Sequence, residues 1–140
     1  MLNPDYIIGL VDGEGSFTAY IRNSDLEKKR RAKAEPRFYL KLIEKDKDIL
    51  YELKKFFSCG NVYFQKDRRE NHQNCYRYEV ANRKDLEKII IPFFQKHQLK
   101  LASRIKDFKI FCRIMKEIKK GKHLTESGLK SLYRIKQKMH

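Results

Sequence analysis

The chain has 140 residues, a length that suits one domain with a buried core. Its 33 lysines and arginines against 18 aspartates and glutamates give a net charge of +15, which predicts a polyanionic partner, nucleic acid before an anionic membrane surface. The sequence shows neither an apolar run near the roughly 20 residues of a spanning helix nor the basic start of a signal peptide, and its three widely spaced cysteines argue against a disulfide framework and for a reducing compartment.

The first predicted element is a helix over residues 4–13, within the stretch YIIGLVDGEGSF, and Asn3 can cap its start. Gly9 lies among apolar residues of this helix, where a glycine costs about 1 kcal/mol relative to alanine. Asp12 and Glu14 lie at its C-terminal end, where the helix dipole disfavours carboxylates. Because two local rules are broken together, this helix is predicted to carry function.

Four later segments alternate between apolar and polar residues, which predicts half-buried strands over residues 16–22, 37–42, 61–65 and 75–80. Residues 23–35 are predicted to be a polar loop that ends at Pro36. Helices are predicted over residues 46–57 and over residues 82–97, with a kink or break at Pro92. Further helices are predicted within about 102–139: one over 102–119 that Gly121 ends, and a last basic helix that residues 125–127 cap. The order α-β-β-α-β-β-α predicts a single α+β domain over residues 1–140, with four antiparallel strands in one sheet and helices behind it.

The polar face of the predicted sheet is rich in arginine, lysine, glutamine and tyrosine, which suit base edges and phosphates. All four strands share this sidedness, and a β-ribbon fits the major groove, which is ~12 Å wide. The alternative, a face that is merely solvated, agrees less well with the charge of +15. The predicted loop over residues 23–35 carries the basic run KKRRAK at residues 28–33, which is either solvated or follows a phosphate backbone. The predicted DNA-binding residues are Thr18, Tyr20, Arg22, Lys28, Arg30, Arg31, Arg37, Tyr39, Lys41, Tyr63, Gln65 and Arg77.

Residues 7–15, which read IIGLVDGEG, resemble the nine-residue signature of the LAGLIDADG homing endonuclease family. Ser16 and Phe17 are a common continuation there, and the predicted element order and the Pro-Phe-Phe stretch at 92–94 also fit. The resemblance covers roughly residues 4–120. It implies the family's αββαββα fold, with a four-stranded saddle sheet and helices on one face. It also implies a site-specific double-strand DNA endonuclease that uses Mg²⁺, with Mn²⁺ as a substitute.

The resemblance further implies that two copies of the signature helix pack at a central interface. Because the motif occurs once in this chain, we expect a homodimer with two-fold symmetry. Each subunit would read half of a near-palindromic DNA site of roughly 20 bp, at about 10 bp for each half. Gly9 would let the two helix backbones approach closely, and Asp12 would orient the helix end or the partner chain. The expected interface residues are Ile8, Gly9, Val11 and Asp12.

By the same resemblance, Glu14 of each subunit is expected to bind Mg²⁺ together with Gly13, near the scissile phosphates. Glu44, at the end of the second strand, is expected to position water; a helix cap or a surface acid is the alternative. A basic residue is expected to stabilise phosphate charge. Three candidates compete for this place, with the first preferred: Arg104, Lys100 and Lys106.

Two other function classes stay open. One is an RNA-binding intron maturase, or a non-cleaving DNA-binding regulator, on the same fold; Glu14 argues against a dead site. The other is a basic protein that coats nucleic acid and binds scrambled DNA equally well. The expected localisation is intracellular, in a mitochondrion or chloroplast or in bacterial or phage cytoplasm, with no membrane partner and no secretion.

Overall fold

The computed structural model describes residues 2–23, 31–66, 69 and 73–139. The predicted α-β-β-α-β-β-α order is confirmed. The elements are α1 (Pro4–Glu14), β1 (Gly15–Arg22), β2 (Lys33–Ile43), a 3₁₀ turn (Glu44–Asp46), α2 (Lys47–Phe57), β3 (Asn61–Gln65), β4 (Cys75–Val80), α3 (Arg83–Asp85), a π-helical turn (Leu86–Ile90), α4 (Ile91–Lys96), α5 (Ala102–Lys119), a second 3₁₀ turn (Lys122–Leu124) and α6 (Glu126–Lys136). No helix of the described residues is long and apolar enough to span a membrane.

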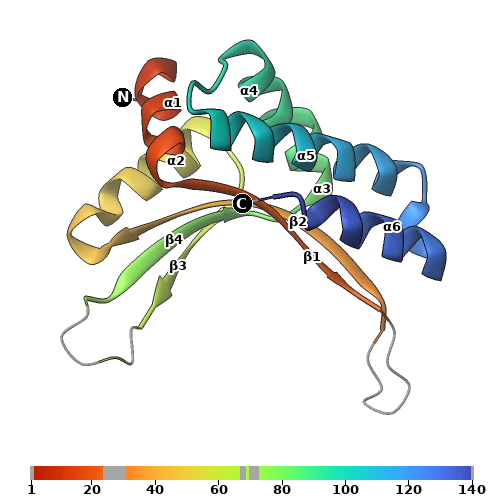
Figure 1. Ribbon diagram of the computed structural model, residues 1–140. Helices are drawn as coiled ribbons and strands as arrows, with labels where there is room; N and C mark the ends of the chain where they lie inside the picture. The colour runs from red at the N-terminus through yellow and green to blue at the C-terminus, as the bar shows by residue number, and fades with distance from the viewer. Residues whose placement is uncertain (1, 24–30, 67–68, 70–72, 140) are drawn as a thin grey trace.

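The sheet is antiparallel throughout, with the strand order β1-β2-β4-β3. It arches, and the helices all lie over its convex side while the concave side carries none (Figure 1). Phe17 pairs with Phe38, and Leu40 pairs with Tyr78, so one set of alternate residues from neighbouring strands meets the helices. The opposite set forms the concave face, as the period-two pattern predicts.

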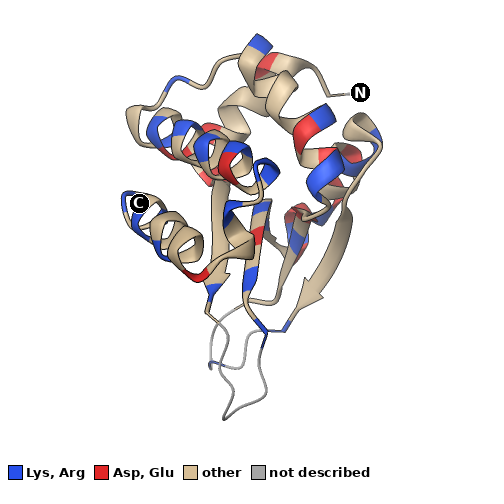
Figure 2. Cartoon of the chain, turned by 90° about the vertical axis from the view of Figure 1, so that its right-hand side faces the viewer, with Lys and Arg blue, Asp and Glu red and all other residues tan. Residues whose placement is uncertain are grey.

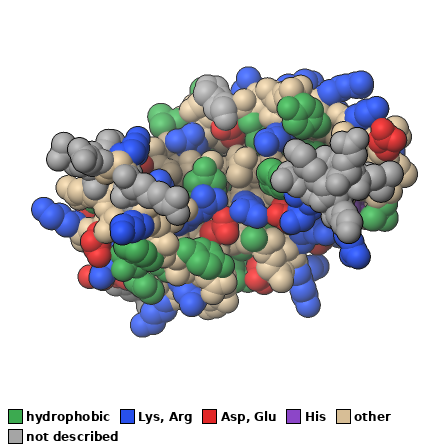
Figure 3. Space-filling view, turned by 90° about the horizontal axis from the view of Figure 1, so that it is seen from below, with side chains coloured by type: hydrophobic (Ala, Val, Ile, Leu, Met, Phe, Trp, Pro, Cys, Tyr) green, Lys and Arg blue, Asp and Glu red, His purple; other side chains and the backbone are tan. Residues whose placement is uncertain are grey.

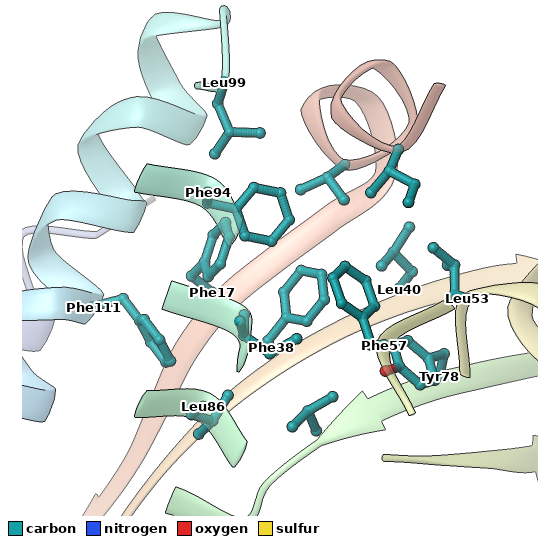
Figure 4. Packing of buried hydrophobic residues seen from close by; sticks show 14 of the residues in the cluster. Phe17, Phe38, Leu40, Leu53, Phe57, Tyr78, Leu86, Phe94, Leu99 and Phe111 are labelled. Carbon is teal, nitrogen blue, oxygen red and sulfur yellow. The ribbon is translucent and has the colours of Figure 1, made fainter. Parts of the chain in front are cut away.

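The core joins this sheet to α4 and α5 through phenylalanines (Figure 4). The ring of Phe17 stacks on that of Phe38 at 5.1 Å and meets the rings of Phe94 and Phe111, each at 5.4 Å. These four side chains come from β1, β2, α4 and α5 and are at most 2% exposed. Because one aromatic cluster holds both strands and both helices, the position of α5 against the sheet is fixed by packing.

The second strand begins earlier than predicted, at Lys33, and Pro36 does not end a loop but pairs with Ala19 inside the sheet. Ala34 and Pro36 are both buried and continue the alternation of β2 towards its start. The pairing of β2 with β4 begins only at Phe38, so the strand is an edge at the proline, where the lost donor is tolerated.

The helix predicted over residues 82–97 runs through α3, a π turn and α4 with helical backbone at each junction, so Pro92 does not break it and the irregular π turn lies just before the proline. The Ile91 N–H bonds to the Leu86 carbonyl, the wider π pattern, immediately before the proline. This turn accommodates the residue whose nitrogen cannot donate, and it keeps Phe94 directed into the core.

The end of α1 is fastened to the start of α5 by Asp12, while Asn3 caps the other end of α1 with a 2.9 Å bond from the Tyr6 N–H. Each carboxylate oxygen of Asp12 accepts the Lys100 N–H at 3.1 Å, and Oδ1 also accepts the Leu101 N–H at 3.2 Å. Leu101 is the N-cap residue of α5, so a buried carboxylate replaces the side-chain cap that leucine cannot supply.

We predict that Asp12→Ala lowers the free energy of unfolding by about 2–3 kcal/mol, because it removes the buried carboxylate that accepts the N–H groups of Lys100 and Leu101 at the start of α5. Asp46→Ala is the matched control: Asp46 is exposed at the N-cap of α2 without a side-chain cap bond, so its loss should change stability by less than about 0.5 kcal/mol. Urea denaturation measures both, and equal losses in the two variants would contradict the assigned role of Asp12.

Candidate functional site

The predicted metal residues Gly13 and Glu14 are both exposed and end α1. The last turn of α1 contains no basic residue, so the carboxylate adds to the negative end of the helix dipole instead of being neutralised. Oxygen ligands of this kind, a carboxylate and the free carbonyls of a helix end, suit a hard divalent cation such as Mg²⁺. The residues therefore fit the metal that the resemblance implies.

One chain supplies only part of such a site. Among the described residues, no group of three or more His, Cys, Asp or Glu side chains could hold a metal ion. Mg²⁺ commonly takes one or two carboxylates and fills the rest of its octahedron with waters and substrate phosphates. Glu14 thus fits as one protein ligand of a site completed by substrate, water or a second chain.

Arg104 is the basic residue that the structure brings to the end of α1. Its Nε donates to the Val11 carbonyl at 3.3 Å, and the same oxygen accepts the Gly15 N–H. The guanidinium is therefore held one helical turn from Glu14, while its terminal nitrogens carry further donors suited to phosphate oxygens. Arg104 lies in the first turn of α5, which Asp12 fastens to α1.

The two competing cations are placed differently. Lys100 touches Asp12 through its backbone N–H, and the residue is exposed. Lys106 is also exposed and lies two positions beyond Arg104 along α5. The geometry thus favours Arg104 among the three predicted residues and leaves Lys100 as an expectation without a structural contact to Glu14.

Glu44 opens the 3₁₀ turn that directly follows β2, and it is exposed. Gly15 pairs with Leu40, and Glu44 follows Leu40 by four residues, one beyond the end of β2, which puts it roughly 13 Å from Leu40 at 3.3 Å per residue. Its backbone N–H donates to the Asn74 carbonyl at 3.0 Å. The structure does not bring Glu44 into contact with Glu14, and its role towards water stays a prediction.

The strand register places the predicted DNA-binding residues of the strands on the concave face, seen from below in Figure 3. Thr18 lies opposite Arg37, and Arg77 lies between Lys41 and Tyr63. Arg22 donates to the Arg31 carbonyl from Nε at 3.2 Å and from Nη2 at 2.8 Å. The other two predicted loop residues, Lys28 and Arg30, lie outside the described residues.

Two acids of the concave face were absent from the predicted set. Glu35 lies opposite Tyr20, and Glu79 lies between Tyr39 and Asn61. Both form ion pairs with arginines of the same face. The alternation that places Arg77 on this face also places Glu79 there, so the sequence contained the signal, and only a preference for basic residues left it out.

The predicted dimer contacts of Ile8 and Val11 are wrong. Val11 is 0% exposed and Ile8 is 5% exposed, so both side chains belong to the chain's own core. Asp12 binds the start of α5, which agrees with the predicted role of orienting the helix end and not with a contact to the partner chain. The exposed side of α1 instead presents Gly9 and Gly13, where an added Cβ would meet no atom within 4 Å.

Residues 7–115 match the family model described as LAGLIDADG endonuclease. The chain is 34% identical over 132 residues, 94% of its length, to "Probable intron-encoded endonuclease 2" of Neurospora crassa, and 31% identical over 142 residues to "Probable intron-encoded endonuclease 3" of the same organism. It spans only 28% and 25% of these two curated relatives.

Solved structures give the same result for the fold. The crystal structure of the homing endonuclease I-TnaI has a TM-score of 0.81 and 35% identity, over 99% of this chain and 88% of that one. The I-SmaMI LAGLIDADG homing endonuclease bound to cleaved DNA has a TM-score of 0.84 and 28% identity, over 100% of this chain and 44% of that one. From the signature helix, the sheet and these matches together, the chain belongs to the LAGLIDADG endonuclease family.

Proposed function

We propose that this chain is one subunit of a homodimeric, Mg²⁺-dependent endonuclease that cleaves both strands of a specific, near-palindromic DNA site of roughly 20 bp. The observation that carries the proposal is the exposed Glu14 at the negative end of α1, beside Arg104 and at the start of a strand whose concave face is rich in cations. Similarity to structures described as bound to cleaved and to uncleaved DNA supports a DNA substrate.

Hydrolysis forms a bond from a water oxygen to phosphorus and breaks the bond to the leaving oxygen, which takes up a proton. Glu14, with the Gly13 carbonyl, would hold Mg²⁺, which when bound stabilises phosphate charge and favours ionisation of water. Arg104 neutralises charge that grows on the phosphate oxygens, and its bond to the Val11 carbonyl fixes the guanidinium before substrate arrives. Glu44 would orient the attacking water.

The homodimer is supported by the exposed side of α1. Gly9 costs helix stability, and since an added Cβ there would meet nothing, no contact within this chain requires a glycine. Gly13 follows at four residues, on the same side of the helix, so a second backbone can approach closely along this stripe. The chain spans 44% of the I-SmaMI chain, which is long enough to hold two units of this size. It spans 88% of the I-TnaI chain, which is long enough for only one.

We predict that Glu14→Gln binds the target DNA with wild-type affinity but cuts it at least 100-fold more slowly, because an amide binds Mg²⁺ poorly. The target can be found by cleavage of a randomised duplex library, and single-turnover rates then measure each variant. Arg104→Ala should also slow cleavage about 100-fold, while the control Lys106→Ala should stay within threefold. Wild-type rates for Glu14→Gln would refute the proposed chemistry.

A second test concerns the interface. Gly9→Leu should raise helix stability by about 0.8 kcal/mol within one subunit, yet it should block dimer formation and cleavage because the added side chain separates the two helices. Lys54→Leu, at an exposed position of α2, adds the same side chain elsewhere and should leave the dimer intact. Sedimentation velocity gives the mass of each variant, and a Gly9→Leu protein that still forms an active dimer excludes this interface.

RNA binding by the helical side is a second candidate function, and the outer side of α5 favours it. Exposed cations recur there at steps of three and four residues, the spacing of one helical face, over about 15 Å. Figure 2 marks Lys and Arg positions along the helices as well as along the strands. The cations of this stripe are Lys106, Lys109, Arg113 and Lys116.

If this stripe binds RNA, Lys109→Glu together with Arg113→Glu should weaken binding of the transcript that contains the reading frame by at least 10-fold, while DNA cleavage stays within threefold. The double variant Lys54→Glu and Lys55→Glu, on the exposed side of α2, carries the same charge change and serves as the control. Filter binding at fixed salt decides the matter. If both double variants lose the same RNA affinity, the stripe on α5 contributes only general electrostatic attraction.

The localisation follows from the substrate and stays a proposal. A DNA endonuclease must share a compartment with DNA, and relatives named as intron-encoded endonucleases support a gene carried in an intron. An organelle, a bacterial cytoplasm or a phage-infected cell would each meet this condition.

A further inference from the structure

Glu79 lies near the middle of the concave face and beneath two arginines. Its Oε1 accepts a hydrogen bond from Arg77 Nη2 at 2.7 Å and lies 3.6 Å from Arg37 Nη1. The side chain is only 13% exposed, whereas that of Arg37 is 36% exposed. One carboxylate therefore anchors two guanidinium groups from neighbouring strands.

Each of these arginines has a second fixed contact. The guanidinium carbon of Arg77 lies 3.6 Å from the centre of the Tyr39 ring, in cation–π geometry. Arg37 Nη2 donates to Glu35 Oε2 at 2.8 Å. Two contacts on each guanidinium restrict both its position and the direction in which its donors point.

Structural stability alone does not account for this arrangement. The Nε atoms of Arg37 and Arg77 are both buried without a hydrogen-bond partner, which is costly for any buried donor. A carboxylate at the centre of a face that would bind phosphates also weakens general attraction to DNA. Both costs are understandable if the network serves to aim the arginines.

Arginines held in a fixed direction are suited to the recognition of guanine in DNA. A guanidinium is a rigid planar fork that matches the O6 and N7 acceptors of guanine in the major groove. A fork already held in place loses less side-chain freedom on binding. Direct recognition of cytosine by Glu79 fits less well, because its side chain is mostly covered and its carboxylate is already shared by two arginines.

We propose that Glu79 is a positioning residue for sequence recognition, which holds Arg37 and Arg77 so that they read guanines in each half of the DNA site. This inference rests on the proposed function, since it requires that the concave face bind DNA. Glu79 itself need not touch a base. Its negative charge lowers the general affinity of the concave face for phosphate, while its hold on the two arginines raises discrimination between base pairs.

The test compares Glu79→Gln with wild type in binding to the selected target and to a scrambled duplex of equal length, at fixed salt. Loss of a negative charge should tighten binding to the scrambled duplex, while loss of the anchor should weaken binding to the target. The ratio of the two affinities should fall about 10-fold, the share of one arginine–guanine contact. Base preferences from the randomised library should relax at guanine positions only.

Two further variants separate position from charge. Glu79→Asp keeps the charge but shortens the side chain, so it should lower the ratio without tighter binding to scrambled DNA. Glu52→Gln, at an exposed site of α2, removes the same charge elsewhere and should leave the ratio unchanged. In an Arg77→Gln background, Glu79→Gln should cause no further loss at the base pair that Arg77 reads.

Equal tightening on both duplexes by Glu79→Gln would overturn the proposal, because the acid would then act only through its charge. Additive losses in the Arg77→Gln background, at the base pair that Arg77 reads, would overturn it as well. Failure of the underlying function is distinguishable, since wild-type protein would then show no preference between target and scrambled DNA. Thermal unfolding of each variant identifies a loss that comes from misfolding, and the Glu79→Asp ratio then decides.

Discussion

The contact that the rest of the site depends on is the carboxylate of Asp12 at the start of α5. It joins positions 88 residues apart in the chain and sets the negative end of one helix against the positive end of another. Glu14 follows Asp12 by two residues, and Arg104 follows Leu101 by three. A single buried acid therefore sets the distance between the proposed metal ligand and the proposed phosphate-binding guanidinium, although it takes part in neither role.

The sheet divides its two tasks between its faces. Side chains of one parity meet the helices and build the aromatic core around Phe17 and Phe38, while those of the other parity face the concave side. A slip of one residue between strands would exchange the two faces, so the core packing that stabilises the domain also fixes which side chains can meet DNA. Stability and recognition are thus linked through register.

The sequence predicted the fold well because period-two and helical patterns are local properties, and α5 begins and ends where its pattern does. The sequence also singled out Gly9, a glycine inside a helix, and Glu14, an acid at a helix C-terminus, as unusual. It misplaced Ile8 and Val11, because apolar residues mark a buried side without saying which chain buries it. It missed the ion pairs of Glu79, because pairing between strands distant in sequence decides which charges meet.

The single exposed carboxylate of Glu14 has a consequence for behaviour in the cell. If a complete metal site needs one such acid from each of two chains, an isolated subunit is harmless to DNA. Below the dissociation constant of the pair, the amount of active enzyme rises with the square of the subunit concentration. Occasional leaky expression would then leave the genome intact, and only a burst of synthesis would produce a break.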